Sequence, residues 1–539
     1  MKNYILALIS ILTLSNQAQE RPKLVVGIVV DQMKMEYLYR FYNDFSEGGF
    51  KRLVNKGYTF HNMHYNYVPT YTAPGHATIY TGATPNIHGI VGNEWFHRTL
   101  GKTIYCTDDD SVKTIGNAVD TDLKNPMSPK NLQATTITDE LRLSTNFKGK
   151  VIGMSLKDRG AILPAGHFAN WAFWFSKNGD FISSTFYGDK LPDWVTKFNA
   201  EKHYLPYLST NWNLLKPIAT YNESMVDDNV YESKLYGCKT PTFPYNVPEM
   251  LQKNDPGIIR SLPFGNDLLA DFAIKAIEME GLGKDDITDF LAVSFSSTDY
   301  VGHDLGPRAM ELQDTYLRLD ATLSNFLNYL DKNIGTNNYL LFLTADHAGA
   351  ENATYLKDNK YDVSSVMPKE IAKSISKFSI DTFGEDFLLN YSNFNVYLKK
   401  EAIKTKGLDF LKVKIAFKEF LLTQNQVKFA FTEEEILASN GSNYFLNFVA
   451  KGYDVTQNGD LVLIDKPGFI EYKTTGTSHG TAYSYDTHVP LLFYGWNIKK
   501  GESFDRKVIT QIAPTLALKL KITLPNGTES NVLSEVLGN

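Results

Sequence analysis

Thr72 stands in a segment whose residue types suit a nucleophile. It lies in the stretch Tyr67-Val-Pro-Thr-Tyr-Thr-Ala-Pro-Gly-His76, where no bulky side chain follows the hydroxyl until position 76. Such a turn lets a substrate and the next helix approach closely. A threonine hydroxyl is a weak nucleophile and needs an adjacent base or a metal ion. Helix capping is the simpler interpretation of Thr-x-Pro, so the rest of the chain has to supply the activating group.

Three aspartates and three of the eleven histidines have the neighbours expected of metal ligands. The set is Asp31, Asp299, His303, Asp346, His347 and His479. Singly, each has a structural interpretation, such as a turn residue for an aspartate that follows a strand. Jointly, histidine and aspartate without thiolates suit a divalent ion such as zinc. Six ligands from four segments are too many for one tetrahedral zinc and fit two. Two ions about 3.5–4 Å apart can hold the attacking and the leaving oxygen of an in-line displacement.

The elements that must position these residues alternate between strands and helices. Continuous apolar runs predict buried strands at 23–30, 150–155, 289–295, 338–344 and 489–494. Apolar residues at helical spacing predict helices over 308–331 and 512–520. This alternation predicts an α/β fold with a mostly parallel central sheet and helices on both faces. Ligands bind such sheets outside the carboxyl ends of the strands, which is where the aspartates lie.

Two long segments interrupt this alternation. Residues 164–285 lack a clean period, whereas residues 352–474 contain two helix-like amphipathic segments, around 400–422 and 432–439, and short strands. Each of the two long segments follows a strand end that carries site residues. We interpret them as insertions that form a lid or rim over one catalytic domain spanning 19–539. An aromatic cluster in the first insertion, at Trp171, Phe173, Trp174 and Phe175, could stack a nucleoside or pack the lid, and we favour packing.

The N-terminus predicts export. Lys2, an apolar run over 4–14 and small or polar residues up to Ala18 form a secretory signal peptide, cleaved after residue 18. Neither this run nor any later one reaches the ~20 apolar residues of a membrane span. The formal charge of −6 and the lack of a long basic run argue against nucleic-acid binding. The two cysteines, Cys106 and Cys238, could pair in an oxidising compartment, a question that the sequence leaves open.

Together these residues resemble the alkaline phosphatase superfamily. The motifs that carry the resemblance are Asp31, Thr72-Ala-Pro-Gly-His76, Asn93, Asp299-x3-His303, Asp346-His347 and His479. The chain is similar to the phosphodiesterase/nucleotide pyrophosphatase-like branch, which uses a threonine nucleophile, and within it to phosphate-irrepressible alkaline phosphatases of the flavobacterial type. The resemblance covers nearly the whole mature chain. It implies the alkaline-phosphatase-like three-layer sandwich.

The resemblance also implies a role for each residue. Asp299, His303 and His479 would hold a first zinc, which stabilises the leaving oxygen. Asp31, Thr72, Asp346 and His347 would hold a second, which lowers the pKa of the Thr72 hydroxyl. Asn93 would donate its amide to a non-bridging phosphoryl oxygen. Thr72 would carry the phosphoryl group as a covalent intermediate.

Lys157 and Arg159 predict a monoester substrate. They follow the apolar run at 150–155 and are two residues apart, so an extended backbone would point both to one face. Arginine can grip two oxygens of a dianionic monoester and lysine adds a point charge, whereas a diester has one charge and a bulky second group. Dedicated diesterases of the superfamily place apolar or small groups here. Other alkaline phosphatases use a third, magnesium site whose carboxylates have no match in this chain, so we expect this pair to replace magnesium.

The sequence therefore predicts an exported, zinc-dependent alkaline phosphatase acting on small-molecule phosphate monoesters, periplasmic or secreted, and monomeric like the enzymes that it resembles. A phosphodiesterase of the same superfamily is the main alternative. An exported metal- or phosphate-binding protein without catalysis is an alternative of another class, but it would not need Thr72 beside a metal. A sulfatase would carry Cys or Ser in place of Thr72, and a phosphoglycerate mutase would lack the signal peptide.

Overall fold

The computed structural model describes residues 21–116 and 126–538, so the predicted signal peptide lies outside the described residues. Its centre is one sheet of eleven strands in the order β16-β2-β15-β10-β1-β9-β6-β7-β8-β5, with β17 beside β2. The bounds are β1 Leu24–Val30, β2 Tyr58–His64, β5 Thr114–Ile115, β6 Val151–Ser155, β7 Trp171–Phe175, β8 Phe181–Ser184, β9 Asp289–Phe295, β10 Tyr339–Thr344, β15 His488–Gly495, β16 Gly501–Ser503 and β17 Lys507–Val508.

The core of this sheet is parallel, which confirms the predicted fold class. Strands β10, β1, β9, β6 and β7 pair in parallel, whereas β15 and β8 run antiparallel to their neighbours β10 and β7. Every residue of β1 and β9 is buried, as expected for strands that are covered on both faces. The five predicted strands all occur, and the run at 489–494 is the antiparallel one.

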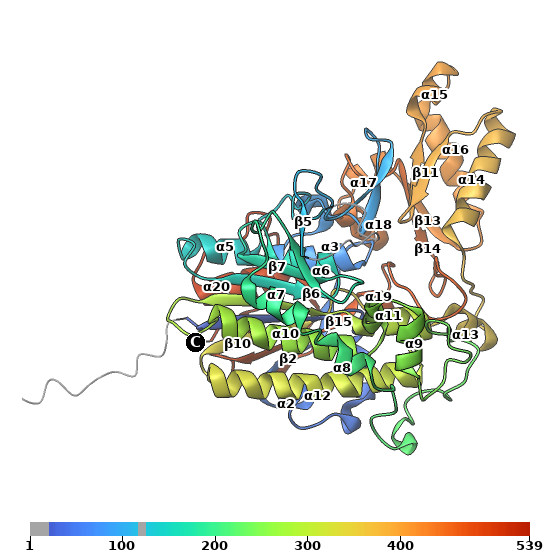
Figure 1. Cartoon of the computed structure of the whole chain (residues 1–539). Helices are drawn as coiled ribbons and strands as arrows, with labels where there is room; N and C mark the ends of the chain where they lie inside the picture. Colours follow the sequence, from blue (N-terminus) through green and yellow to red (C-terminus); the bar gives the residue numbers. More distant parts are fainter. Residues whose placement is uncertain (1–20, 117–125, 539) are drawn as a thin grey trace, which may run out of the picture.

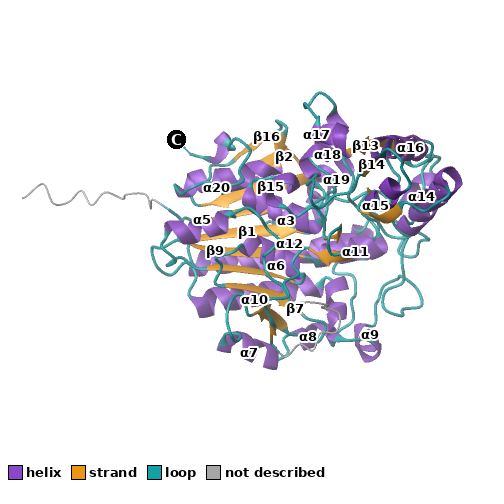
Figure 2. Cartoon of the chain, turned by 90° about the horizontal axis from the view of Figure 1, so that it is seen from above, coloured by secondary structure: helices purple, strands orange, loops and turns teal. Residues whose placement is uncertain are grey.

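Helices cover both faces of the sheet, as Figure 1 shows. One face carries α10 and α12, and the other carries α3, α5, α6 and α20; seen from above, α3, α6 and α20 lie across the strands (Figure 2). Their bounds are α3 Thr72–Thr81, α5 Ile137–Ser144, α6 Asp158–Ala165, α10 Phe264–Glu280, α12 Met310–Asn333 and α20 Ile512–Leu520. The predicted helices at 308–331 and 512–520 are therefore confirmed, the first with a shift of two residues.

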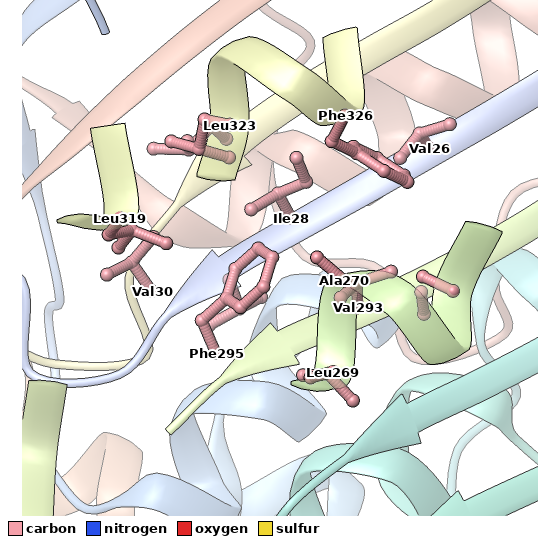
Figure 3. Packing of buried hydrophobic residues seen from close by; sticks show 14 of the residues in the cluster. Val26, Ile28, Val30, Leu269, Ala270, Val293, Phe295, Leu319, Leu323 and Phe326 are labelled. Atoms are coloured by element: carbon pink, nitrogen blue, oxygen red, sulfur yellow. The ribbon is translucent and has the colours of Figure 1, made fainter. Parts of the chain in front are cut away.

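Alternation along β1 assigns its side chains to the two faces. Figure 3 shows Val26, Ile28 and Val30 packed against Leu319, Leu323 and Phe326 of α12. Burial of each such side chain stabilises the fold by about 1.5–3 kcal/mol. The intervening Gly27 faces α3, because a Cβ there would lie only 2.5 Å from the hydroxyl oxygen of Tyr80. Glycine thus lets α3, the helix that begins at Thr72, lie close to the central strand.

The segment 352–474 is a folded unit that stands beside the sheet (Figure 1). It contains its own four-stranded sheet, in the order β11-β12-β14-β13, and its own cluster of buried apolar residues. The bounds are β11 Leu388–Ser392, β12 Asn395–Leu398, β13 Val427–Thr432, β14 Leu461–Asp465, α14 Pro368–Phe383, α15 Lys400–Thr405, α16 Phe410–Leu422, α17 Glu433–Leu437 and α18 Tyr444–Gly452. The predicted insertion therefore has a core of its own.

The segment 164–285 does not lie wholly outside the sheet, contrary to its interpretation as a lid. Its strands β7 and β8 extend the main sheet, and its helix α10 covers one face. The aromatic cluster packs inside: the ring of Phe173 lies 5.5 Å from Phe272 and 5.8 Å from Trp194. This confirms packing as the role of the cluster. The missed strands are short apolar runs without a period, which resemble loop packing in sequence.

Two further findings concern the cysteines and the membrane. The thiols of Cys106 and Cys238 are both free. Over residues 21–116 and 126–538, none of the helices has the length and apolar character needed to cross a membrane.

Candidate active site

The predicted site residues meet at the carboxyl ends of the parallel strands. Asp31 directly follows β1, and Asp346 comes two residues after β10. Asp299 and His303 lie on helix α11 (Ser297–Leu305), which follows β9, and Lys157 lies just after β6. Strands β10, β1, β9 and β6 are consecutive neighbours in the sheet, so residues more than 300 positions apart in sequence reach one place.

The first group that could hold a metal ion consists of Asp299, His303 and His479. The spacing of four residues puts Asp299 and His303 on the same face of α11, with His303 Nε2 3.1 Å from Asp299 Oδ1. His479 Nε2 lies 3.8 Å from the same oxygen. Although burial opposes ionisation of Asp299, the neighbouring His303 and Lys157 hold its pKa well below the usual range.

The second group consists of Asp31, Asp346 and His347, all fully buried. His347 Nε2 lies 3.4 Å from Asp31 Oδ1 and 3.6 Å from Asp346 Oδ2. The Thr72 hydroxyl oxygen lies 3.4 Å from the same nitrogen. Burial lowers the pKa of His347 to about 3, so its imidazole is neutral, the form in which histidine binds metals.

The three histidines of the two groups, His303, His347 and His479, present the same ring nitrogen to the site. Each has its Nδ1 within 2.7–2.8 Å of a backbone carbonyl, which leaves Nε2 with its lone pair turned towards the carboxylates. The carbonyls belong to Thr477, Ala348 and Thr70, for His303, His347 and His479 respectively. A hydrogen bond from the second nitrogen to a carbonyl is the usual support of a metal-binding histidine.

Two orphaned oxygens in the second group also fit a cation. Asp31 Oδ1 and Asp346 Oδ2 are buried and have no hydrogen-bond partner. A buried carboxylate oxygen without a partner is costly unless a cation offsets its charge. Burial and the mutual repulsion of the two carboxylates raise the pKa of Asp346 well above its usual value. A divalent ion between them would remove that repulsion, so the residues present fit a metal.

Thr72 is the first residue of helix α3, and its side chain is buried. The preceding Tyr71 occupies the N-cap position and no side chain caps the helix. Capping, the simpler interpretation of Thr72, is therefore wrong. A helix N-terminus attracts negative charge, which suits a phosphoryl group on the hydroxyl. The Ala73 N–H donates to Asn93 Oδ1 at 2.8 Å, so the amide nitrogen is the atom of this side chain that could donate to a substrate.

Lys157 and Arg159 lie at the start of α6, so the expected extended backbone is found only at Lys157. Lys157 occupies the N-cap position with an extended conformation, whereas Arg159 belongs to the first helical turn. The Lys157 ammonium donates to Asp31 Oδ2 at 2.6 Å and also to Asp299 Oδ2. It thus contacts a carboxylate of each ligand group. Arg159 Nη1 donates to the Tyr105 hydroxyl at 2.7 Å, and its buried Nε has no partner.

The sequence did not single out Tyr105 or Gln32. Tyr105 ends β4 (Lys102–Tyr105) and pairs with Glu94 of β3 (Glu94–His97), the residue that follows Asn93. The hairpin therefore brings the partner of Arg159 next to Asn93. No signal in a single sequence distinguishes this tyrosine among 31. Gln32 follows Asp31 directly, and that position is the only available hint.

The comparisons with known proteins agree with this geometry. A family model described as type I phosphodiesterase / nucleotide pyrophosphatase matches residues 25–488. The chain is 43% identical over 524 residues to alkaline phosphatase PafA of Elizabethkingia meningoseptica, which covers 97% of this chain and 95% of that protein. Identity to alkaline phosphatase PhoV of Synechococcus elongatus is 44% over 522 residues, covering 97% and 94%.

One more relative and one solved structure are also similar to this chain. A protein of Myroides odoratus named calcium-transporting ATPase is 44% identical over 534 residues, covering 98% of this chain and 97% of its own length. The crystal structure of wild-type PafA matches the fold with a TM-score of 0.92 at 42% identity, covering 96% of this chain and 99% of that one. The similarity thus extends over nearly the whole chain.

Proposed function

The chain belongs to the type I phosphodiesterase / nucleotide pyrophosphatase family of the alkaline phosphatase superfamily, and we propose that it acts there as an alkaline phosphatase, a hydrolase of phosphate monoesters. One observation carries the proposal. The carboxyl ends of the parallel strands bring together Thr72, the two candidate metal groups and the Lys157–Arg159 pair. The chain is also similar over nearly its full length to two alkaline phosphatases.

The proposed cofactors are two zinc ions. Asp299, His303 and His479 would hold one, and Asp31, Asp346 and His347 would hold the other together with Thr72. The lack of thiolates and the mix of imidazole and carboxylate support zinc. When bound, the ions supply positive charge that lowers the pKa of the Thr72 hydroxyl and stabilises negative charge on the transferred group.

The residues of the chain then have defined tasks. Thr72 Oγ loses its proton to solvent and forms a bond to phosphorus while the bond from phosphorus to the leaving oxygen breaks, and the leaving oxygen takes up a proton from water. Water next attacks the phosphothreonine, which releases inorganic phosphate and restores the hydroxyl. Asn93 donates its amide to a non-bridging oxygen, and the N-terminus of α3 adds its partial positive charge. Two successive in-line displacements give net retention at phosphorus.

The charge of the site supports a dianionic substrate. The three carboxylates of the two groups carry three negative charges, and Lys157 and Arg159 carry two positive charges, so the net charge of these five groups is −1. Two divalent ions would turn this into three net positive charges, enough to attract a phosphate monoester. The family description supports a second candidate, diester hydrolysis. A diester carries only one negative charge and would be attracted less strongly by this net positive charge, so we place diester hydrolysis second.

We further propose that the enzyme is exported after cleavage of residues 1–18 and that it acts as a monomer in the periplasm or outside the cell. The test of the proposed function combines zinc analysis with kcat/KM for an aryl phosphate monoester, a diester and a sulfate that share one leaving group. We expect two zinc ions per chain and a clear preference for the monoester. Bound metal without turnover of any ester would instead indicate a binding protein.

A further inference from the structure

Gln32 occupies an unusual place in the backbone. It directly follows Asp31 at the end of β1, is 5% exposed, and has a φ of 64°. Residues other than glycine rarely adopt this left-handed conformation. Strain of this kind persists where the surrounding structure holds it, and it concentrates at functional sites. The contacts of Gln32 show what the conformation achieves.

One residue reaches both ligand groups. The side-chain amide of Gln32 donates from Nε2 to Asp299 Oδ1 at 2.7 Å. Its backbone N–H donates to Asp346 Oδ1 at 3.2 Å. We infer that Gln32 is a positioning residue that holds one carboxylate of each metal-ligand group and so fixes the spacing of the two groups. This inference rests on the proposed two-metal enzyme.

The packing around Gln32 leaves its amide little freedom. A Cβ added to Gly302, on the helix that carries Asp299 and His303, would lie 2.1 Å from Gln32 Oε1. A Cβ on Gly349, in the loop that follows His347, would lie 3.2 Å from Gln32 Cγ. Two glycines, one in each ligand-bearing segment, therefore form the slot in which the side chain lies. The slot holds the Gln32 side chain in place, and its amide donates to Asp299, so together they orient the Asp299 carboxylate.

The two contacts differ in how they respond to mutation. Only the bond to Asp299 depends on the side chain, since the bond to Asp346 comes from the backbone. Asp346 Oδ1 also receives the His347 N–H at 3.1 Å, so this carboxylate keeps its orientation without the glutamine side chain. Truncation of Gln32 therefore affects the group of Asp299, His303 and His479 and spares the other.

The experiment measures zinc retention instead of turnover. Wild type, Gln32→Ala and Gln32→Gly are equilibrated with chelator-buffered free zinc and analysed for bound zinc per chain. We expect both variants to bind one of the two ions about 10- to 100-fold more weakly than wild type, the usual cost of losing an outer hydrogen bond. This ion should therefore dissociate from the variants at a correspondingly higher free zinc concentration. The second ion should be retained as in wild type.

The pair of variants separates the side chain from the backbone. Glycine adopts a φ of 64° without strain, whereas alanine does not. Equal zinc loss in both variants supports the loss of the amide, and loss in Gln32→Ala alone would attribute the effect to strain and overturn the inference. Gln457→Ala is the matched control, because it removes an amide that donates to Gly89 O at 2.9 Å, and it should retain both ions.

The outcome also separates this inference from the proposed function. A wild-type protein that binds two zinc ions and hydrolyses the monoester, with Gln32 variants that retain both ions like wild type, would overturn only the positioning role. A wild-type protein without bound zinc would refute the two-metal proposal itself.

Discussion

The Nε2 atom of His347 lies 3.4 Å from the hydroxyl oxygen of Thr72, although 275 residues separate them in the sequence. The close approach depends on a glycine. A Cβ on Gly75, one turn into α3, would lie 2.1 Å from the carbonyl oxygen of Asp346. The small residues after Thr72 therefore allow the start of α3 to pack against the loop that carries Asp346 and His347.

Metal removal should abolish activity. The three histidines present Nε2 to buried carboxylates, two oxygens of which have no partner, which fits a site that binds cations. We expect dialysis against a strong chelator to remove two zinc ions per chain and all phosphomonoesterase activity, and zinc to restore both. Rates and zinc content measured on the same samples test this. Full activity in a zinc-free sample would contradict it.

Replacement of Thr72 should separate chemistry from metal binding. Thr72→Ser keeps a hydroxyl at the helix start, so we expect kcat/KM within about tenfold of wild type. Thr72→Ala removes the nucleophile, and we expect a loss of at least about 1,000-fold while both ions stay bound. Zinc analysis of the alanine variant is the control for an intact site.

The stereochemistry of the reaction tests the covalent step. Transfer to Thr72 followed by hydrolysis inverts phosphorus twice, so a chiral phosphate monoester should react with net retention. Inversion would mean that water attacks the substrate directly. In that case Thr72 would serve only to bind metal or substrate.

A partly buried carboxylate outside the two ligand groups predicts a pH effect on stability. Burial raises the pKa of Asp267, on α10, from 3.8 to about 6. Between these values the folded state binds more protons than the unfolded state, so the free energy of unfolding falls as the pH rises from about 4 to 6. Asp267→Asn removes this titration. We expect it to stabilise the protein by about 1–2 kcal/mol at pH 8 and to have almost no effect below about pH 4.

The control for this prediction lies on the same helix. Asp271→Asn, four residues further on, changes an exposed carboxylate that accepts a hydrogen bond from Tyr207. Denaturant unfolding of both variants at pH 4, 6 and 8 provides the measurement. A gain from Asp267→Asn that does not change with pH would show that another contact, such as the one with Thr322, is responsible.

The sequence predicted which residues come together in the two candidate metal groups, because strand ends and residue type restrict them. A parallel sheet brings its carboxyl ends together, so Asp31 and Asp346 were expected to meet without knowledge of the strand order. Tyr105 and Gln32 escaped prediction, because their roles depend on a hairpin pairing and on a left-handed backbone. The four-stranded sheet of the 352–474 insertion escaped as well, although short strands were expected there, because β12 and β13 pair with β14 across intervening helices.

Loss of the Lys157–Arg159 pair should harm monoester hydrolysis more than diester hydrolysis. Lys157 donates to Asp31 and Asp299, and Arg159 has a buried Nε without a partner. We expect the Lys157→Ala/Arg159→Ala variant to lose about 2–5 kcal/mol of transition-state stabilisation for a monoester, or about 30- to 5,000-fold in kcat/KM. The diester, with one outward charge fewer, should change much less.

Lys157 contacts both ligand groups, so the comparison needs a control for metal binding. The single variant Arg159→Ala touches no carboxylate of either group, and Tyr105→Phe removes only the hydroxyl that accepts from Arg159 at 2.7 Å. Both should retain two zinc ions and still lose more activity on the monoester than on a diester with the same leaving group, Tyr105→Phe less than Arg159→Ala. If the Lys157→Ala/Arg159→Ala variant lost equal activity on the two substrates, the pair would support the metal site and would not recognise the charge of the substrate. The diesterase alternative would then become the better description of the enzyme.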